Sequence, residues 1–261
     1  MSAATVTRPP APELRYNLME LAETLTDVIS LGRGDPDMHT PPEIVDAGMA
    51  LLAGSATSSP VQGTLELRRA IAERYRIDKG LDLNPAREIL VTTGAQEGLF
   101  LAMLALVNPD DGVLIPDPRY SSYDQAIEAA GGRIVEVPTD AAHDFRLDAD
   151  RLRSVIDQGA VLVFVNPNNP TGSLVSQAGV QAIAAVAREA GVAVISDEIY
   201  ESLTFDGQGV QSVMAIDGMR RSTVTLSGFS KTYAMTGFRV GYLIGPPSFI
   251  EAAARIKAAV S

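Results

Sequence analysis

From residue 63 onward, short apolar runs alternate with longer segments of helical periodicity. The apolar runs lie at 88–94, 112–118, 133–140, 160–167, 192–200, 222–231 and 239–245, and the helical segments at 63–80, 95–107, 121–132, 148–159 and 176–191. The runs LVFV and VAVI are apolar throughout, which is typical of strands buried on both faces. The sequence therefore predicts an α/β fold, with a mostly parallel sheet flanked by helices on both faces.

Composition and charge exclude several kinds of protein. The chain has 261 residues, 46% of them hydrophobic, with a formal net charge of −11 and no cysteine. The negative charge disfavours a nucleic-acid partner, and the lack of cysteine excludes disulfides, thiolate metal sites and a cysteine nucleophile. His39 and His143 are too few for a histidine metal cluster, so we expect no metal site.

The N-terminal segment has no apolar signal-peptide core, and no stretch reaches the apolar length of a membrane span. These features predict a cytoplasmic protein without a membrane partner. Prolines at 9, 10 and 12 predict an irregular arm, residues 28–37 a short strand running into a loop, and residues 40–54 a helix that Gly54 ends.

In an open α/β sheet, ligands bind beyond the carboxyl ends of the strands, so the residues after each apolar run are the candidate site. GAQEG (94–98) leads from a strand directly into a helix, whose first N–H groups favour a phosphate. In isolation a tight turn explains this segment better. Tyr120 follows the next run, where it could stack on a flat ring or simply pack against its neighbours.

Polar side chains also follow the two most apolar runs. In NPNNPTG (166–172), two prolines stiffen a loop that can hold an asparagine amide as a hydrogen-bond donor. Asp197 ends an apolar run, where a buried carboxylate needs a cationic partner such as a protonated pyridine nitrogen. Tyr200, three residues on, could point its hydroxyl at the same ligand.

Lys231 lies among small, hydroxyl-bearing and apolar residues in SGFSKTYAMTGFRVGY (227–242), and Arg239 follows eight positions later. A lysine can form a Schiff base with an aldehyde, and the planar fork of arginine suits a phosphate dianion. Pyridoxal phosphate needs partners for its aldehyde, ring nitrogen, phenolate oxygen, phosphate and ring face. Five strand ends supply these five partners.

The motifs GRGDPD, GTLELRRAIA, TTGAQEGL, NPNNPTG, SDEIYESL and SGFSKTYAMTGFRVGY span roughly residues 28–245 and resemble those of the class I/II aminotransferases, which are fold-type I pyridoxal-phosphate-dependent enzymes. The resemblance implies pyridoxal 5′-phosphate as cofactor and transfer of an amino group between an amino acid and a 2-oxo acid, in amino acid metabolism. It implies an N-terminal arm and part of a small domain in residues 1–45, and a large cofactor-binding domain in residues 46–261. A homodimer is implied if the full-length domain is present.

The resemblance also assigns roles by position. The residues assigned to catalysis or to the cofactor are Lys231, Asp197, Tyr200, Ala95, Gln96, Tyr120, Asn169, Ser230 and Arg239. In this assignment Lys231 bears the Schiff base, Asp197 binds the ring nitrogen and Tyr120 stacks on the ring. Asn169 and Tyr200 bind the phenolic oxygen, and the other four residues hold the phosphate. Substrate contacts are assigned to Gly34, Tyr120 and Asn169.

The chain departs from the family pattern in three respects. Family members are substantially longer, so we expect a C-terminally truncated chain that lacks most of the small domain and the arginine that grips the substrate carboxylate. Ser58 stands where a tyrosine often reaches the partner subunit's phosphate. Gly228 stands where many relatives have serine, so Ser230 or Ser227 must supply the hydroxyl for the phosphate.

Two other functions stay open. A pyridoxal-phosphate-dependent carbon–sulfur β-lyase would share the cofactor contacts and differ in its substrate pocket. An inactive, truncated aminotransferase domain would retain the contacts without turnover. Gly228 excludes a Ser-x-x-Lys hydrolase dyad at Lys231, and the net charge disfavours a transcription regulator built on this fold.

Overall fold

The computed structural model describes residues 14–29, 34–54, 58–205 and 207–260. The chain divides into two compact units, Met1–Pro36 and Asp37–Ser261. The described part of the first unit contains helix α1 (Leu14–Thr24). Residues 28–37 were predicted as a short strand running into a loop. Residues 34–37 have no strand conformation, in keeping with the loop, and neither have Val28 and Ile29; the rest of the predicted strand lies outside the described residues.

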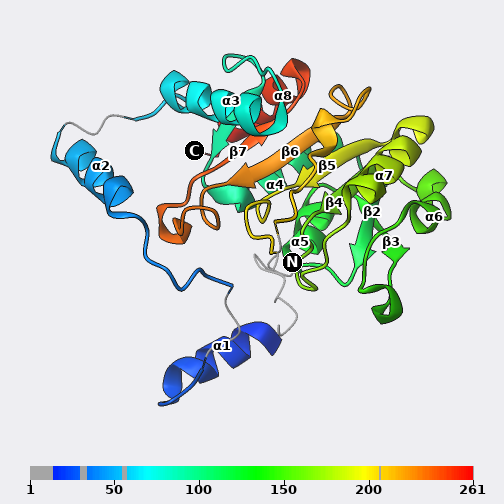
Figure 1. Ribbon diagram of the computed structural model, residues 1–261, viewed down its shortest axis with the longest axis horizontal. Helices are drawn as coiled ribbons and strands as arrows, with labels where there is room; N and C mark the ends of the chain where they lie inside the picture. Colours follow the sequence, from blue (N-terminus) through cyan, green and yellow to red (C-terminus); the bar gives the residue numbers. More distant parts are fainter. Residues whose placement is uncertain (1–13, 30–33, 55–57, 206, 261) are drawn as a thin grey trace, which may run out of the picture. The chain divides into compact units, whose positions relative to one another are not determined.

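The second unit is built on a seven-stranded sheet with the order β1-β7-β6-β5-β4-β2-β3 (Figure 1). Its strands are β1 (Ile89–Thr92), β2 (Gly112–Asp117), β3 (Arg133–Pro138), β4 (Val161–Val165), β5 (Ala193–Asp197), β6 (Thr223–Gly228) and β7 (Gly241–Ile244). The pairs β2–β3, β2–β4, β4–β5 and β5–β6 are parallel, whereas β7 is antiparallel to both of its neighbours, β1 and β6. The predicted mostly parallel sheet is confirmed.

Helices cover both faces of this sheet, as predicted. One core lies under α4 (Gly94–Leu106), α5 (Ser122–Ala129) and α8 (Pro247–Lys257). The other face carries two cores, one under α6 (Ala149–Arg153) and α7 (Gln177–Ala190), the other under α3 (Leu65–Lys79). In β5, Ile195 enters the first core and Val194 the α7 side. Alternate residues of a strand point to opposite faces, so a strand covered on both faces must be apolar throughout.

Helix ends follow the local sequence signals. The Thr64 side chain accepts the N–H of Leu67 at the start of α3, and Gly80 ends this helix at φ +67°. Pro42 begins α2 (Pro42–Ala53), and Gly54 follows its last residue. The helix predicted at 148–159 is shorter, because α6 ends at Arg153 and a separate 3-10 turn covers Ile156–Gln158. Val155 between them has left the helical region, in keeping with the poor helix propensity of a β-branched residue.

The sheet brings five strand ends to one edge. Strands β2, β4, β5 and β6 are parallel neighbours. Strand β1 runs in the same direction as β6, since both are antiparallel to β7. The segments that follow these five strands therefore meet at the same edge of the sheet. Among the described helices, none has the length and apolar character needed to cross a membrane.

Candidate functional site

The start of α4 and the guanidinium of Arg239 form one end of the site. Gly94, the first residue of α4, has φ +73°, and a Cβ built on it would lie 2.4 Å from Nη2 of Arg239. The first N–H groups of a helix have no intrahelical acceptor, and no side chain of Thr93 caps this helix. Free N–H groups, the positive end of a helix and an arginine fork together suit a phosphate group.

Strand β7 packs directly on the same helix start. A Cβ built on Gly241 would lie 2.6 Å from the backbone nitrogen of Ala95, so a side chain there would displace this N–H group. Ser230 is buried in the turn after β6, and Lys231, the next residue, is half-buried. Ala95 and Gln96 lie in the first turn of α4.

Asp197 lies at the carboxyl end of β5 with 6% of its surface exposed. The hydroxyl of Tyr123 donates to Oδ2 at 2.6 Å, and the N–H of Ile199 donates to Oδ1 at 3.0 Å. Burial raises the pKa of Asp197, while these two hydrogen bonds lower it. Each carboxylate oxygen receives one donor and retains a lone pair for a further one.

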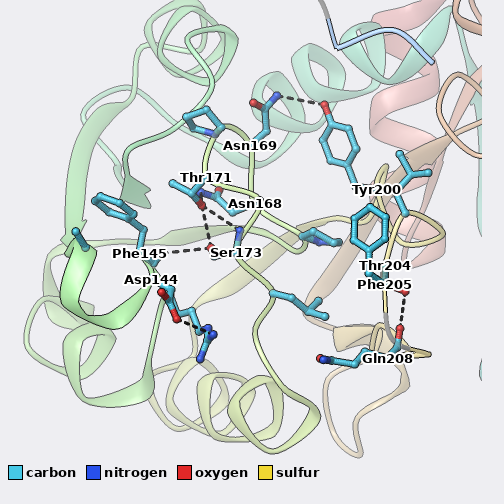
Figure 2. Close-up of a pocket in the computed structure, with 17 residues that line it drawn as sticks. Asp144, Phe145, Asn168, Asn169, Thr171, Ser173, Tyr200, Thr204, Phe205 and Gln208 are labelled. Atoms are coloured by element: carbon cyan, nitrogen blue, oxygen red, sulfur yellow. Dashed lines mark hydrogen bonds and ion pairs between the residues drawn. The ribbon is translucent and has the colours of Figure 1, made fainter. Parts of the chain in front are cut away.

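The loop after β4 places its asparagine against Tyr200. The amide Nδ2 of Asn169 donates to Oη of Tyr200 at 3.2 Å (Figure 2). Burial, and then the negative charge of Asp197, raise the pKa of Tyr200, so its phenol stays protonated. A pocket of about 710 Å³ opens beside this pair, between the 167–174 loop, residues 144–146, residues 203–205 and Gln208.

Tyr120 follows β2 and packs against Tyr123, which hydrogen-bonds Asp197. The rings of Tyr120 and Tyr123 meet edge to face, with 6.3 Å between centroids and 89° between planes. The N–H of Tyr123 donates to the carbonyl of Tyr120 at 3.1 Å, which joins both rings to one helical turn. A flat ligand held by Asp197 would therefore come close to the ring of Tyr120.

A second buried acid, Glu198, lies on the opposite face of β5. Ser196 and Ser212 donate to its Oε1 at 2.9 and 2.8 Å. Burial raises the pKa of Glu198 to about 7; Glu201 adds to the shift, and Lys79, which pairs with Glu201 at 2.8 Å, opposes it. Neither this cluster nor its pKa was predicted from the sequence.

The structure brings together most of the predicted residues. Ala95, Gln96 and Arg239 meet at the start of α4, Asn169 contacts Tyr200, and Asp197, Tyr120, Ser230 and Lys231 follow neighbouring strands at the same edge. Gly34 belongs to the other unit, so its substrate contact stays a prediction. Sequence analysis missed Tyr123, although its place three residues after Tyr120, one helical turn on, was a signal for it.

Comparisons with known proteins agree with this arrangement. Residues 26–261 match the family model described as aminotransferase class I and II. The chain is 38% identical to aromatic-amino-acid aminotransferase 2 of Thermococcus litoralis, over 92% of this chain and 62% of that relative. It is 40% identical to the aspartate aminotransferase of Pyrococcus abyssi, over 90% of this chain and 61% of that relative.

Solved structures show the same likeness. The structure of N-succinyldiaminopimelate aminotransferase from Mycobacterium tuberculosis superposes with a TM-score of 0.93 at 36% identity, covering 99% of this chain and 68% of that one. The fold is that of the pyridoxal-phosphate-dependent aminotransferases on which the chain superposes. The chain belongs to the class I and II aminotransferase family. It spans about three fifths of the length of the two curated relatives, at 62% and 61%.

Members of this family depend on pyridoxal 5′-phosphate, and the described residues fit that group. The glycine at position 94 leaves room for the Arg239 guanidinium beside a helix start, which suits the phosphate. The buried carboxylate of Asp197 has acceptor capacity left for a ring N–H group. The phenol and amide of Tyr200 and Asn169 offer donors for a phenolic oxygen.

Proposed function

We propose that this chain is the cofactor-binding part of a pyridoxal-phosphate-dependent aminotransferase, which moves an amino group between an amino acid and a 2-oxo acid. The observation that carries the proposal is the buried Asp197 carboxylate, which ends β5 beside the strand that leads to Lys231. Asp197 lies where burial without a cation is costly, and a protonated pyridine nitrogen would supply that cation. Within this proposal, residues 46–261 are the large domain, and residues 1–45 the arm and part of a small domain.

The predicted residues then take the following roles toward the cofactor. Lys231 would hold the cofactor covalently, and its amine, once free, would accept the proton that leaves the substrate's α-carbon. Asp197, ionised, keeps a proton on the ring nitrogen. Asn169 and Tyr200 donate to the phenolic oxygen, and Tyr120 covers one face of the ring. Ala95, Gln96, Ser230 and Arg239 hold the phosphate. When bound, pyridoxal phosphate supplies a ring that withdraws electrons from the α-carbon.

The substrates are an amino acid and a 2-oxo acid, and we propose that Gly34, Tyr120 and Asn169 contact them. The relatives quoted above are all named as aminotransferases, and they lend no support to a carbon–sulfur β-lyase. A domain that binds cofactor without turnover remains the alternative, because the chain spans only part of its relatives' length.

Covalent trapping tests this proposal. The chain has three lysines, Lys79, Lys231 and Lys257. After incubation with pyridoxal phosphate and reduction with borohydride, peptide mapping should find the cofactor on Lys231 and not on the other two. Before reduction, the loaded wild-type chain should show a long-wavelength absorbance band that Lys231→Ala lacks. Absence of both signals in the wild-type chain would rule out cofactor binding by this chain.

Turnover is tested separately, with single amino acids added to the loaded protein. An aminotransferase releases the matching 2-oxo acid, with no ammonia and no more than one equivalent per site. A β-lyase releases pyruvate and ammonia continuously. A loaded protein that forms neither product would be the inactive domain.

We also propose a homodimer in the cytoplasm. Helix α2 supports the dimer, because it has no buried residue and exposes Val45, Met49, Leu51 and Leu52. Apolar side chains gathered on one exposed helix are typical of a protein–protein contact. Light scattering on the purified chain would measure the oligomeric state, and cell fractionation the location.

A further inference from the structure

We propose that Tyr123 is a positioning residue that holds the Asp197 carboxylate in place to receive the protonated ring nitrogen of the cofactor. The inference rests on the proposed function and deepens it, because it adds a residue that acts on the cofactor only through another side chain.

The geometry of the pair supports this role. The phenol of Tyr123 is 2.6 Å from Oδ2 of Asp197, and both residues are buried, at 3% and 6% exposure. The distance is at the short end of the range for hydrogen bonds to a carboxylate, where such bonds are stronger than those between neutral groups. Ile199 N–H binds the other oxygen, so two donors from two elements restrain the carboxylate at both oxygens.

The phenol can only donate in this environment. Burial, and then the negative charge of Asp197, raise the pKa of Tyr123 well above its ordinary value, so it stays protonated. Burial raises the pKa of Asp197, and the Tyr123 hydrogen bond opposes this rise more than any other contact. Without that phenol, the carboxyl of Asp197 would take up a proton at a higher pH. A protonated carboxyl does not stabilise a protonated ring nitrogen.

The first turn of α5 also aligns two predicted contacts with the ring. Tyr120 and Tyr123 are joined by the hydrogen bond from Tyr123 N–H to Tyr120 carbonyl and by their edge-to-face rings. Arg119 secures the segment, donating to Asp124 at 2.6 Å and to Asp117 at 3.1 Å. Tyr123 thus links the residue proposed for the ring face to the residue proposed for the ring nitrogen.

The titratable groups around this pair come from several segments. Tyr200 follows β5, and burial raises its pKa above the ordinary phenol value. Tyr120 precedes α5 and contributes a second phenol. Lys231 follows β6 at the same edge of the sheet. Glu198, the neighbour of Asp197 in sequence, lies on the opposite face and hydrogen-bonds Ser196 and Ser212.

The test measures binding of pyridoxamine 5′-phosphate by calorimetry from about pH 5 to pH 8, above the ordinary aspartate pKa of about 3.9, because burial raises the pKa of Asp197. This amine form makes no covalent bond with Lys231, so its affinity reports the non-covalent contacts. Tyr123→Phe should weaken binding about tenfold at neutral pH, as expected for loss of a hydrogen bond to a charged group. Plotted against pH, the affinity falls as Asp197 takes up a proton, and we call this fall the acid limb of the curve. In Tyr123→Phe the acid limb should move to higher pH. The ligand titrates identically with every variant, so differences between curves come from the protein.

Two controls make the test specific. Tyr75→Phe removes another buried phenol, on α3 and the opposite face of the sheet, and should leave the affinity and the acid limb unchanged. In an Asp197→Asn background, Tyr123→Phe should have little further effect, because the group on which it acts has lost its charge. An unchanged acid limb in Tyr123→Phe, or an equal loss in the Asp197→Asn background, would overturn the inference.

The outcomes separate this inference from the proposed function. If the wild-type chain does not bind the ligand at all, the proposed function fails; if it binds and Tyr123→Phe binds equally, only the role of Tyr123 fails. Should Tyr123→Phe not fold, 3-fluorotyrosine at position 123 provides a near-isosteric and more acidic donor. It should move the acid limb to lower pH, and an unchanged limb would count against the inference.

Discussion

The guanidinium of Arg239 lies against the backbone of Gly94 at the start of α4, since a Cβ at Gly94 would stand 2.4 Å from Nη2 and 2.8 Å from Cζ. Two properties of glycine at position 94 make this contact possible. Only glycine leaves this space empty, and only glycine adopts φ +73° without strain. The N–H groups of α4 and the guanidinium can then face one anion together.

We expect Gly94→Ala to weaken binding of pyridoxal phosphate by about tenfold or more, because the new methyl group displaces Arg239 from the phosphate position. The left-handed backbone adds a stability cost of about 1–2 kcal/mol. Calorimetric titration with pyridoxamine 5′-phosphate and thermal unfolding would measure the two effects.

Gly80→Ala is the matched control for this change. Gly80 has a similar φ of +67°, but a Cβ there meets nothing within 4 Å. It should show a similar backbone cost with unchanged cofactor affinity. Equal affinity losses in both variants would mean that backbone strain, and not the displacement of Arg239, weakens binding.

The hydrogen bond between Asn169 and Tyr200 predicts coupled effects on the cofactor. Asn169→Ala and Tyr200→Phe should each weaken binding about tenfold, through loss of a donor to the phenolic oxygen. The double variant should lose less than the product of the two, because each residue orients the other. A double-mutant cycle on the binding constants measures this, and strictly multiplicative losses would argue against the coupling.

The raised pKa of Glu198 should make the unfolding free energy depend on pH. This pKa rises from 4.5 to about 7 in the folded chain, and one pKa unit corresponds to about 1.4 kcal/mol. A raised pKa stabilises the fold fully below 4.5, and this contribution is lost as pH rises through about 7. The loss amounts to about 3 kcal/mol.

Glu198→Gln should therefore flatten the dependence of unfolding free energy on pH between about 5 and 8. The amide retains an oxygen for the hydroxyls of Ser196 and Ser212, so the change removes the charge and little else. Urea unfolding at several pH values gives the slope. A slope equal to that of the wild-type chain would place the titrating group elsewhere.

Replacing Lys79 should destabilise the fold more than replacing an exposed cation. Lys79 pairs with Glu201 at 2.8 Å, with side-chain exposures of 15% and 13%, and donates to the Val210 carbonyl at 3.1 Å. Lys79→Met leaves Glu201 without its partner and removes the cation that lowers the pKa of Glu198. We expect a loss of about 3 kcal/mol at neutral pH, as for other broken buried pairs.

Arg255→Met is the control for this loss. Arg255 pairs with Glu251 on α8, but the two side chains are 77% and 66% exposed. Exposed pairs contribute less than about 1 kcal/mol, so chemical unfolding should barely change. Similar losses in the two variants would contradict the role of burial at Lys79.

Several elements could be predicted because their signals are local. Strand β4 is apolar at every position, and α3 begins with threonine and ends with glycine. The orientation of β7 was beyond such reasoning, because strand order and direction depend on which strands pair across the sheet. The helix expected at 148–159 ends early for a local reason: the apolar pattern continues past Arg153, but Val155, a β-branched residue, leaves the helical region.

Some residues of the site could likewise be predicted from local sequence, and others could not. Lys231 and Asp197 were predicted because charged residues after apolar runs require a partner. Arg239 was predicted because its planar fork suits a phosphate dianion. Glu198 is more buried than its neighbour Asp197, at 1% against 6% exposure, yet it points to the other face, toward hydroxyls and Lys79. Sequence reasoning did not single it out, since its partners Lys79 and Ser212 come from segments far away in the chain.

The sequence by itself determined the strands of the sheet, the helix caps and the types of residue that follow the strands. Periodicity, capping and charge are properties of neighbouring residues, so local reasoning reaches them. Only the tertiary structure decided which of these residues meet. The bond between Tyr123 and Asp197 joins residues 74 positions apart, and the contact between Arg239 and Gly94 joins the start of one helix to a distant turn. Burial and short distances set these contacts and the pKa shifts that follow, and both exist only once the chain has folded.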